Sequence, residues 1–87
     1  MATVVLPRSL IAILPGAQRR VDVQRGTVAN VIDELEGAIP GIRNRLLDGG
    51  PSIRQHLNVF VDGQRADLAT MVPAAGVVHV IPAVSGG

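Results

Sequence analysis

A single segment, residues 27–39, carries apolar side chains at the spacing of an amphipathic helix. Its apolar face consists of Val28, Val31, Ile32, Leu35 and Ile39. Thr27 can cap the first turn by accepting a hydrogen bond from a backbone N–H, and Pro40 with Gly41 ends the helix. Residues 42–47 are predicted to add a short second helical piece. A chain with one main helix of this kind buries its apolar face against a sheet, in a two-layer α+β fold.

The other apolar segments have the composition of strands. Residues 3–6 form a β-branched run, and residues 56–61 and 77–81 are the clearest strands. Residues 9–14 and 18–24 flank a Pro-Gly turn signal, which predicts a hairpin between them. A smaller hairpin is predicted at the Asp-Gly pair that follows residue 61. This order of elements suggests one mixed sheet curled over one main helix, the ubiquitin-like β-grasp arrangement.

Alternation within the two clearest strands divides their side chains between two faces of the sheet. The face toward the core receives Leu57, Val59, Val61, Val78 and Val80. The opposite face receives Asn58, Phe60, His79 and Ile81. Phe60, His79 and Ile81 are therefore expected to form an exposed apolar patch near the end of the chain, of the kind on which protein partners dock. The alternative is that the faces are reversed and Phe60 packs in the core.

Composition excludes several classes of function. The 87 residues are 47% hydrophobic and 17% charged with a net charge of +1, which is typical of a small globular domain and too weakly basic to indicate nucleic-acid binding. The chain has no cysteine and no lysine, so neither a disulfide framework nor a thiolate metal site can form. No segment approaches the roughly 18–20 apolar residues of a membrane span, and the start lacks the features of a signal peptide. We expect a cytoplasmic protein, monomeric by itself, with a single domain at 1–87 that comprises a globular body at 1–82 and a flexible tail at 83–87.

The sequence ends in Val84-Ser85-Gly86-Gly87. Because glycine has no side chain, the last two residues can enter a narrow enzyme tunnel that any Cβ would obstruct. An α-carboxyl group titrates at about 3.3–3.7, so the terminal carboxylate is ionised near neutral pH. It can then act as a nucleophile toward a nucleotide phosphate held by another protein. The alternative is a frayed terminus without function.

With these segments in place, the chain resembles the MoaD/ThiS family of prokaryotic sulfur carriers over essentially its whole length. The resemblance rests on Leu6-Pro7, on Thr-Val-Ala-Asn-Val-Ile-Asp-Glu-Leu-Glu at 27–36, on Leu-Asn-Val-Phe-Val-Asp-Gly at 57–63, and on Val-Ile-Pro-Ala-Val-Ser-Gly-Gly at 80–87. The ending is the specific part. The Arg-Leu-Leu-Asp segment at 45–48 is most similar to the branch that contains CysO, the carrier for cysteine biosynthesis. One departure is Ala75-Gly76, where the family usually has Gly-Asp, which puts the stability of that turn in question.

The resemblance implies a carrier that has no catalysis of its own and binds no cofactor. It implies that an adenylyltransferase similar to ubiquitin-activating enzymes uses ATP and Mg²⁺ to adenylate the carboxylate of Gly87. A sulfur donor then converts the adenylate to a thiocarboxylate, and a sulfur-accepting biosynthetic enzyme uses that sulfur. In this scheme Gly86 keeps the tail slim, and Ser85 and Val84 belong to the same tail.

Three alternatives remain at this point. The chain could be the small subunit of molybdopterin synthase, or a carrier for thiamine or a secondary metabolite. It could instead be a ubiquitin-like modifier joined to lysines of other proteins, since the same activation chemistry would serve and its own lack of lysine would prevent self-chaining. It could also be a β-grasp interaction module with an incidental Gly-Gly.

Other polar residues show no pattern of a catalytic or metal site. His56 and His79 have no ligand-type partner at metal-binding spacing, so no metal site is expected. The acidic residues of the predicted helix are interpreted as a solvated face: Asp33, Glu34 and Glu36. Arg43 and Arg45 are interpreted in the same way, with contact to an acidic partner as the alternative. The chain has no Gly-rich phosphate loop, so it is not expected to bind ATP alone.

Overall fold

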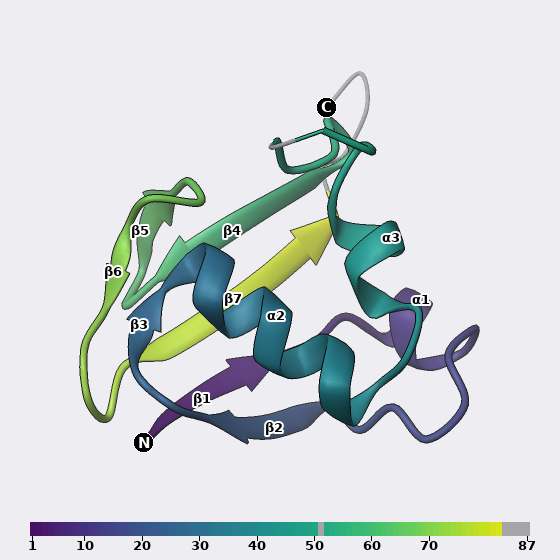
Figure 1. Ribbon diagram of the computed structural model, residues 1–87, viewed down its shortest axis with the longest axis horizontal. Coiled ribbons are helices and arrows are strands. Elements are labelled where there is room, and N and C mark those ends of the chain that lie inside the picture. The colour runs from purple at the N-terminus through teal and green to yellow at the C-terminus, as the bar shows by residue number, and fades with distance from the viewer. Residues whose placement is uncertain (51, 83–87) are drawn as a thin grey trace.

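The computed structural model describes residues 1–50 and 52–82 and shows a mixed sheet of five strands with the main helix across one face (Figure 1). Its strands are β1 (Ala2–Val5), β2 (Arg20–Val23), β4 (Leu57–Val61), β5 (Gln64–Ala66) and β7 (Val77–Pro82), in the order β2-β1-β7-β4-β5. The middle strand, β7, pairs parallel with β1 and antiparallel with β4. The α+β architecture predicted from the sequence is confirmed.

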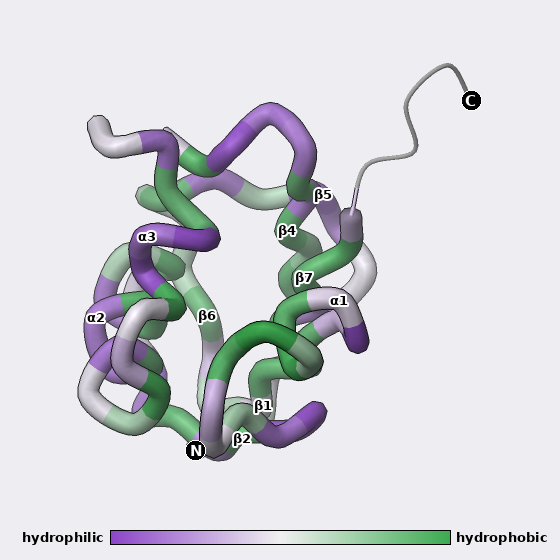
Figure 2. Tube along the Cα trace, turned by 90° about the vertical axis from the view of Figure 1, so that its right-hand side faces the viewer, coloured by the Kyte–Doolittle hydropathy of each residue, from purple (hydrophilic) through white to green (hydrophobic). Residues whose placement is uncertain are grey.

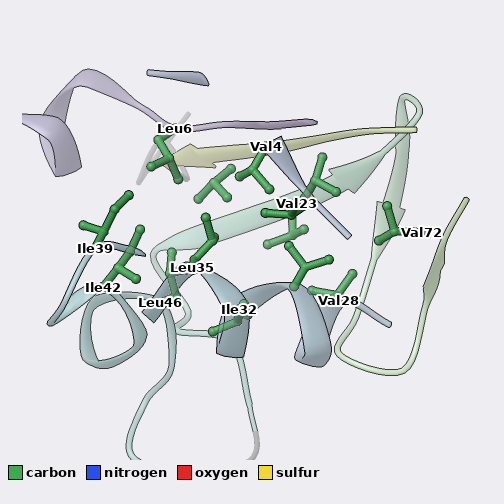
Figure 3. Packing of buried hydrophobic residues seen from close by; sticks show 14 of the residues in the cluster. Val4, Leu6, Val23, Val28, Ile32, Leu35, Ile39, Ile42, Leu46 and Val72 are labelled. Atoms are coloured by element: carbon green, nitrogen blue, oxygen red, sulfur yellow. The ribbon is translucent and has the colours of Figure 1, made fainter. Parts of the chain in front are cut away.

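The main helix, α2 (Val28–Ala38), crosses one face of the sheet (Figure 1). Its first turn is closed by a capping box, in which Asn30 N donates to Thr27 Oγ1 and Thr27 N donates to Asn30 Oδ1, both at 3.1 Å. The predicted apolar stripe is buried and packs against side chains from the sheet such as Val4 and Val23 (Figure 3). Periodicity and the cap signal thus located this helix correctly.

A short helix, α3 (Ile42–Leu46), follows α2 after a tight turn at Gly41, whose φ is +97°. This is the short helical piece predicted at 42–47, and its Ile42 and Leu46 lie in the core. The carboxylate of Glu36 accepts the N–H of Gly41 at 2.9 Å and the N–H of Arg43 at 2.8 Å. These two bonds join the end of α2 to the start of α3. In a view at a right angle, both helices lie on one side of the molecule and strands β1, β4 and β7 on the other (Figure 2).

The hairpin predicted between residues 9–14 and 18–24 is wrong. The first of these segments begins as a short helix, α1 (Arg8–Ile11), and β2 pairs antiparallel with β1 instead. Leu10 and Leu14 lie four residues apart, are both 7% exposed, and join the core cluster together. The apolar run therefore has a helical spacing that we interpreted as a strand, and the true partner of β2 lies earlier in the chain.

The hairpin predicted at the Asp-Gly pair is confirmed between β4 and β5. Asp62 has φ of +49° and Gly63 has φ of +84°, the left-handed pair that a type I′ turn requires. The Asp62 carboxylate also accepts the N–H of Val77 at 2.8 Å. The turn is thereby tied to the first residue of β7.

A second, two-stranded sheet was not predicted. It pairs β3 (Gly26–Thr27) antiparallel with β6 (Met71–Val72). The backbone N–H of Val28 continues this contact by donating to the carbonyl of Thr70 at 2.9 Å. The start of α2 is therefore held by the segment that precedes the last strand.

In the turn before β7, an alanine rather than the neighbouring glycine has the left-handed backbone conformation. Ala75 has φ of +63°, whereas Gly76 is absent from the described residues with positive φ. Gly76 is needed for space, because a Cβ there would lie 2.9 Å from the carbonyl oxygen of Pro73. The sequence signal for a turn at this place was right, but the left-handed residue is the alanine.

Candidate docking face

Strand β7 alternates between a buried and an exposed side. Val78 and Val80 are 2% and 5% exposed and face α2, whereas Ile81 is 44% exposed and His79 is also exposed. We call the side of the sheet that faces away from α2 the open face. The predicted division of β7 between the core and the open face is confirmed.

The three residues predicted as a docking patch come together on the open face. His79 of β7 lies directly opposite Phe60 of β4, and Ile81 lies opposite Asn58, one diagonal step from Phe60. Phe60 is half-buried, while its neighbours Val59 and Val61 are buried on the core side. Phe60 therefore does not belong to the core cluster. Docking by these residues stays a prediction.

The strand registers extend this pair into a row across the whole sheet. Val5 of β1 lies beside His79, Arg20 of β2 lies opposite Val5, and Arg65 of β5 lies opposite Phe60. We call this set the arginine row; in order it runs Arg20, Val5, His79, Phe60, Arg65. Its middle is apolar apart from the imidazole, and both ends are guanidinium groups. Sequence reasoning missed Arg20, Val5 and Arg65. The place of Arg20 and Val5 depends on which distant strands pair, whereas the Asp-Gly hairpin could have placed Arg65 opposite Phe60.

The next row, one step farther from the end of β7, has the opposite charge. Thr3 lies opposite Asp22 and beside Val77, whose N–H reaches Asp62. Thr3 Oγ1 donates to Asp22 Oδ1 at 3.4 Å. We call Asp22, Thr3, Val77 and Asp62 the aspartate row. The open face is thus positive at its edges near the end of β7 and negative one step away.

The predicted tail residues lie outside the described residues: Val84, Ser85, Gly86 and Gly87. The described chain ends at Pro82, which still belongs to β7 and lies opposite Leu57. β7 therefore continues one residue beyond the predicted end at residue 81. Ile81, next to this end, is the docking-patch residue closest in sequence to Gly87.

The acidic residues of α2 have more specific contacts than a solvated face requires. Asp33 forms an ion pair with Arg43, and Glu34 accepts the N–H of Gln24 at 2.8 Å. The two backbone hydrogen bonds from Gly41 and Arg43 lower the pKa of Glu36 below its ordinary value, since they stabilise its carboxylate. These carboxylates hold the fold together on the helical side. They lie on the layer opposite the open face (Figure 2).

Metal-binding geometry is not found in the part of the chain that the structure describes. There, His, Cys, Asp and Glu side chains form no group of three or more that could hold a metal ion.

A shallow hollow of about 570 Å³ lies between the β4–β5 hairpin and residues 52–57, and Ile53, Leu57 and Leu68 contribute to its lining. Within residues 1–50 and 52–82, no helix has the length and apolarity that a membrane crossing requires.

Comparison with known proteins links this fold to small carriers and modifiers. The model of the ThiS family matches residues 4–87. Small archaeal modifier protein 1 of Haloferax volcanii is 35% identical over 69 residues, which cover 78% of this chain and 79% of the relative. Sulfur carrier protein CysO of Mycobacterium tuberculosis is 32% identical over 78 residues, which cover 83% of this chain and 84% of the relative.

Solved structures agree with the sequence comparison. The crystal structure of Mycobacterium tuberculosis CysO has a TM-score of 0.86 at 30% identity and covers 97% of this chain and 100% of its own. A chain of the Amycolatopsis orientalis BexX/CysO complex has a TM-score of 0.87 at 27% identity, with 100% of both chains covered. The ubiquitin-like β-grasp fold predicted from the sequence is confirmed.

Proposed function

Because the chain belongs to the ThiS family, we propose that it is a sulfur carrier whose reactive group is the carboxylate of Gly87. The observation that carries this proposal is the extent of the family match, which continues through residue 87 and so includes the Gly-Gly ending. The match to a protein named as a sulfur carrier, over 84% of that relative, points in the same direction.

The chemistry that we propose has two steps on the tail. A carboxylate oxygen of Gly87 attacks the α-phosphorus of ATP held by an adenylyltransferase, and pyrophosphate leaves. Hydrosulfide then attacks the acyl carbon of the adenylate, AMP leaves, a proton is released, and a thiocarboxylate remains. Activation is required because a carboxylate oxygen is a poor leaving group. ATP, Mg²⁺ and the catalytic groups belong to the partner, and this chain supplies the reactive end.

In this proposal the adenylyltransferase binds the folded body of the chain. We propose that Phe60, His79 and Ile81 on the open face contact that enzyme. The open face suits this role because Ile81 immediately precedes Pro82, where the described part of β7 ends. An enzyme bound to this patch is therefore close to the end of β7 and, along the sequence, to Gly87. Exposed apolar residues with a single aromatic anchor are typical of such contacts.

The acceptor that we propose is a biosynthetic enzyme of the kind served by CysO. The resemblance to the CysO branch implies cysteine formation. The similarity to CysO, at 32% identity over 78 residues, supports this choice over the molybdopterin and thiamine alternatives. The acceptor would receive the terminal sulfur as a nucleophile.

A second function, attachment to lysines of other proteins, is supported by one observation. Small archaeal modifier protein 1, at 35% identity, is named as a modifier. The activation step would be the same, so the two functions differ only in the group that attacks the activated end. A modifier would transfer its acyl carbon to a lysine amine, and AMP would leave.

Intact-mass spectrometry tests the proposal. The chain is incubated with ATP, Mg²⁺, sulfide and the ubiquitin-activating-like adenylyltransferase of the same organism. A carrier gains the mass of one oxygen-to-sulfur exchange, whereas a modifier appears in lysine-linked adducts when cell protein is added. Deletion of Gly87 should abolish the exchange without lowering thermal stability. An unchanged mass of the intact chain under these conditions contradicts the carrier function.

A Phe60→Asp variant tests whether the adenylyltransferase contacts the open face. It should slow thiocarboxylate formation and keep the fold, because Phe60 lies outside the core cluster. Far-UV circular dichroism reports the fold in the same sample. Activation at the unchanged rate in a folded variant would show that the open face does not contact the adenylyltransferase.

A further inference from the structure

The two ends of the arginine row carry charges that no carboxylate of residues 1–50 and 52–82 neutralises. Arg20 and Arg65 are exposed, and neither forms an ion pair or side-chain hydrogen bond with any residue in the described ranges. Two carboxylates lie nearby along the same strands or loops, but both have other partners. Asp22 accepts from Thr3 Oγ1, and Asp67 accepts the N–H of Ala69 at 2.9 Å. As far as the described part of the chain goes, both guanidinium groups are therefore available to an outside group.

The spacing of the row separates these charges into two independent contacts. Arg20 and Arg65 lie on the two edge strands of the sheet, with Val5, His79 and Phe60 between them. Neighbouring strands lie about 4.8 Å apart, so the two backbone positions are roughly 19 Å apart across the sheet. Salt screens exposed charges beyond about 8 Å at physiological ionic strength. One acidic group on a partner cannot serve both arginines.

From this pattern we propose that the partner of the open face presents an apolar centre flanked by two separate carboxylate groups. The apolar centre covers Phe60 and Ile81, since Val5 is itself only 8% exposed; one carboxylate pairs with Arg20, and the other pairs with Arg65. A guanidinium favours a carboxylate because its planar N–H groups can form two parallel hydrogen bonds with it. This inference rests on the proposed function, because it describes the adenylyltransferase surface that holds the chain.

The aspartate row fixes the position of the docked partner along the strands. A partner shifted by one row would bring its carboxylates toward Asp22 and Asp62 instead of the arginines. Like charges at an interface oppose association. Only the position over the arginine row therefore pairs both carboxylates.

Charge-reversal variants test the proposal in the adenylation assay. Pyrophosphate release is measured with the ubiquitin-activating-like adenylyltransferase of the same organism as the concentration of the chain is varied. Arg20→Glu and Arg65→Glu should each raise the KM for the chain by about tenfold and leave kcat unchanged. The double variant should raise KM by about the product of the two single effects, roughly a hundredfold, since distant sites act additively.

The matched control is Arg45→Glu, which changes the net charge by the same amount. Arg45 is exposed on α3, on the side of the molecule away from the open face (Figure 2). The KM for the Arg45→Glu variant should stay within about twofold of the KM for the unchanged chain. KM of the unchanged chain should rise with added salt, and this rise should be less steep in each single variant because one screened pair is missing.

Several outcomes overturn the proposal. If either Arg20→Glu or Arg65→Glu has the KM of the Arg45→Glu control, the partner does not carry two acidic contacts. A loss in kcat alone also contradicts docking. If a glutamate variant is found unfolded by circular dichroism, the Arg→Gln variant at the same position must raise KM instead.

The same experiment separates this inference from the proposed function. If the unchanged chain is not adenylated at all, the proposed function fails. Normal adenylation of the unchanged chain together with unaffected arginine variants refutes only the two-carboxylate surface. Direct binding of the chain to the enzyme without ATP, measured by interferometry, gives the same comparison without any chemical step.

Discussion

Two neighbouring residues of β7 should lose stability to different extents when each is changed to alanine. Val80 is 5% exposed and belongs to the core cluster, whereas Ile81 is 44% exposed on the open face. Val80→Ala removes two buried methyl-sized groups, worth about 0.8 kcal/mol each in transfer free energy. The cavity left behind adds to this, for a total loss of about 2–3 kcal/mol in the free energy of unfolding. Ile81→Ala removes more atoms, but about half of their surface is already in water, so about 1 kcal/mol is expected.

Urea and thermal unfolding followed by far-UV circular dichroism measure these losses. The chain has no tryptophan or tyrosine, which makes intrinsic fluorescence a poor probe. About 4–8 °C of melting temperature is lost per kcal/mol in a domain of this size, so Val80→Ala should melt roughly 8–24 °C lower. Under conditions where both variants are folded, only Ile81→Ala should weaken adenylation. A larger loss of stability in Ile81→Ala than in Val80→Ala, or slower adenylation only in Val80→Ala, would refute the assignment of the two faces.

Three further changes test other parts of the structure. Gly37→Ala, at an exposed position inside α2 where an added Cβ meets nothing within 4 Å, should raise the free energy of unfolding by about 0.5–1 kcal/mol in urea titrations. Ala75→Asn should stabilise the chain by about 0.5–1 kcal/mol, because asparagine tolerates the left-handed backbone better than alanine; a loss of stability would contradict the φ of this residue. Glu36→Gln should destabilise the chain near neutral pH. The pKa of Glu36 is lowered in the folded state, so its contribution is present above the ordinary value and is lost as pH falls through the lowered one. The difference between variant and unchanged chain should therefore vanish in acid, and a constant difference would show that charge is not involved.

Local signals in the sequence located the elements that are held by local contacts. The apolar spacing of α2 and the cap at Thr27 placed this helix, and the Asp-Gly pair placed the β4–β5 hairpin. Strict alternation assigned Val78, Val80 and Phe60 to the correct faces. Each of these features depends on residues that are close in sequence.

Features that depend on pairing between strands far apart in the sequence could not be predicted from local signals. The parallel contact of β1 with β7 joins the two ends of the chain, and nothing near Val5 indicates that His79 is its neighbour. The arginine row follows from four registers at once, and only that of the β4–β5 hairpin is local, so Arg20 and Arg65 could not be grouped from spacing. The misassigned segment at 9–14 failed for a related reason, because its apolar residues suit either a strand or a helical turn until the partner of β2 is known.

The central position of β7 has a consequence for how the protein is made. Synthesis proceeds from the N-terminus, and the β1–β2 and β4–β5 hairpins emerge before the strand that lies between them. Until residues 77–82 leave the ribosome, the two hairpins have no shared neighbour and the core beneath α2 stays incomplete. Strand β7 also leads directly to the end that we propose to be chemically active. A ribosome product that stops before residue 77 thus lacks both the central strand and the terminus that we propose to be reactive.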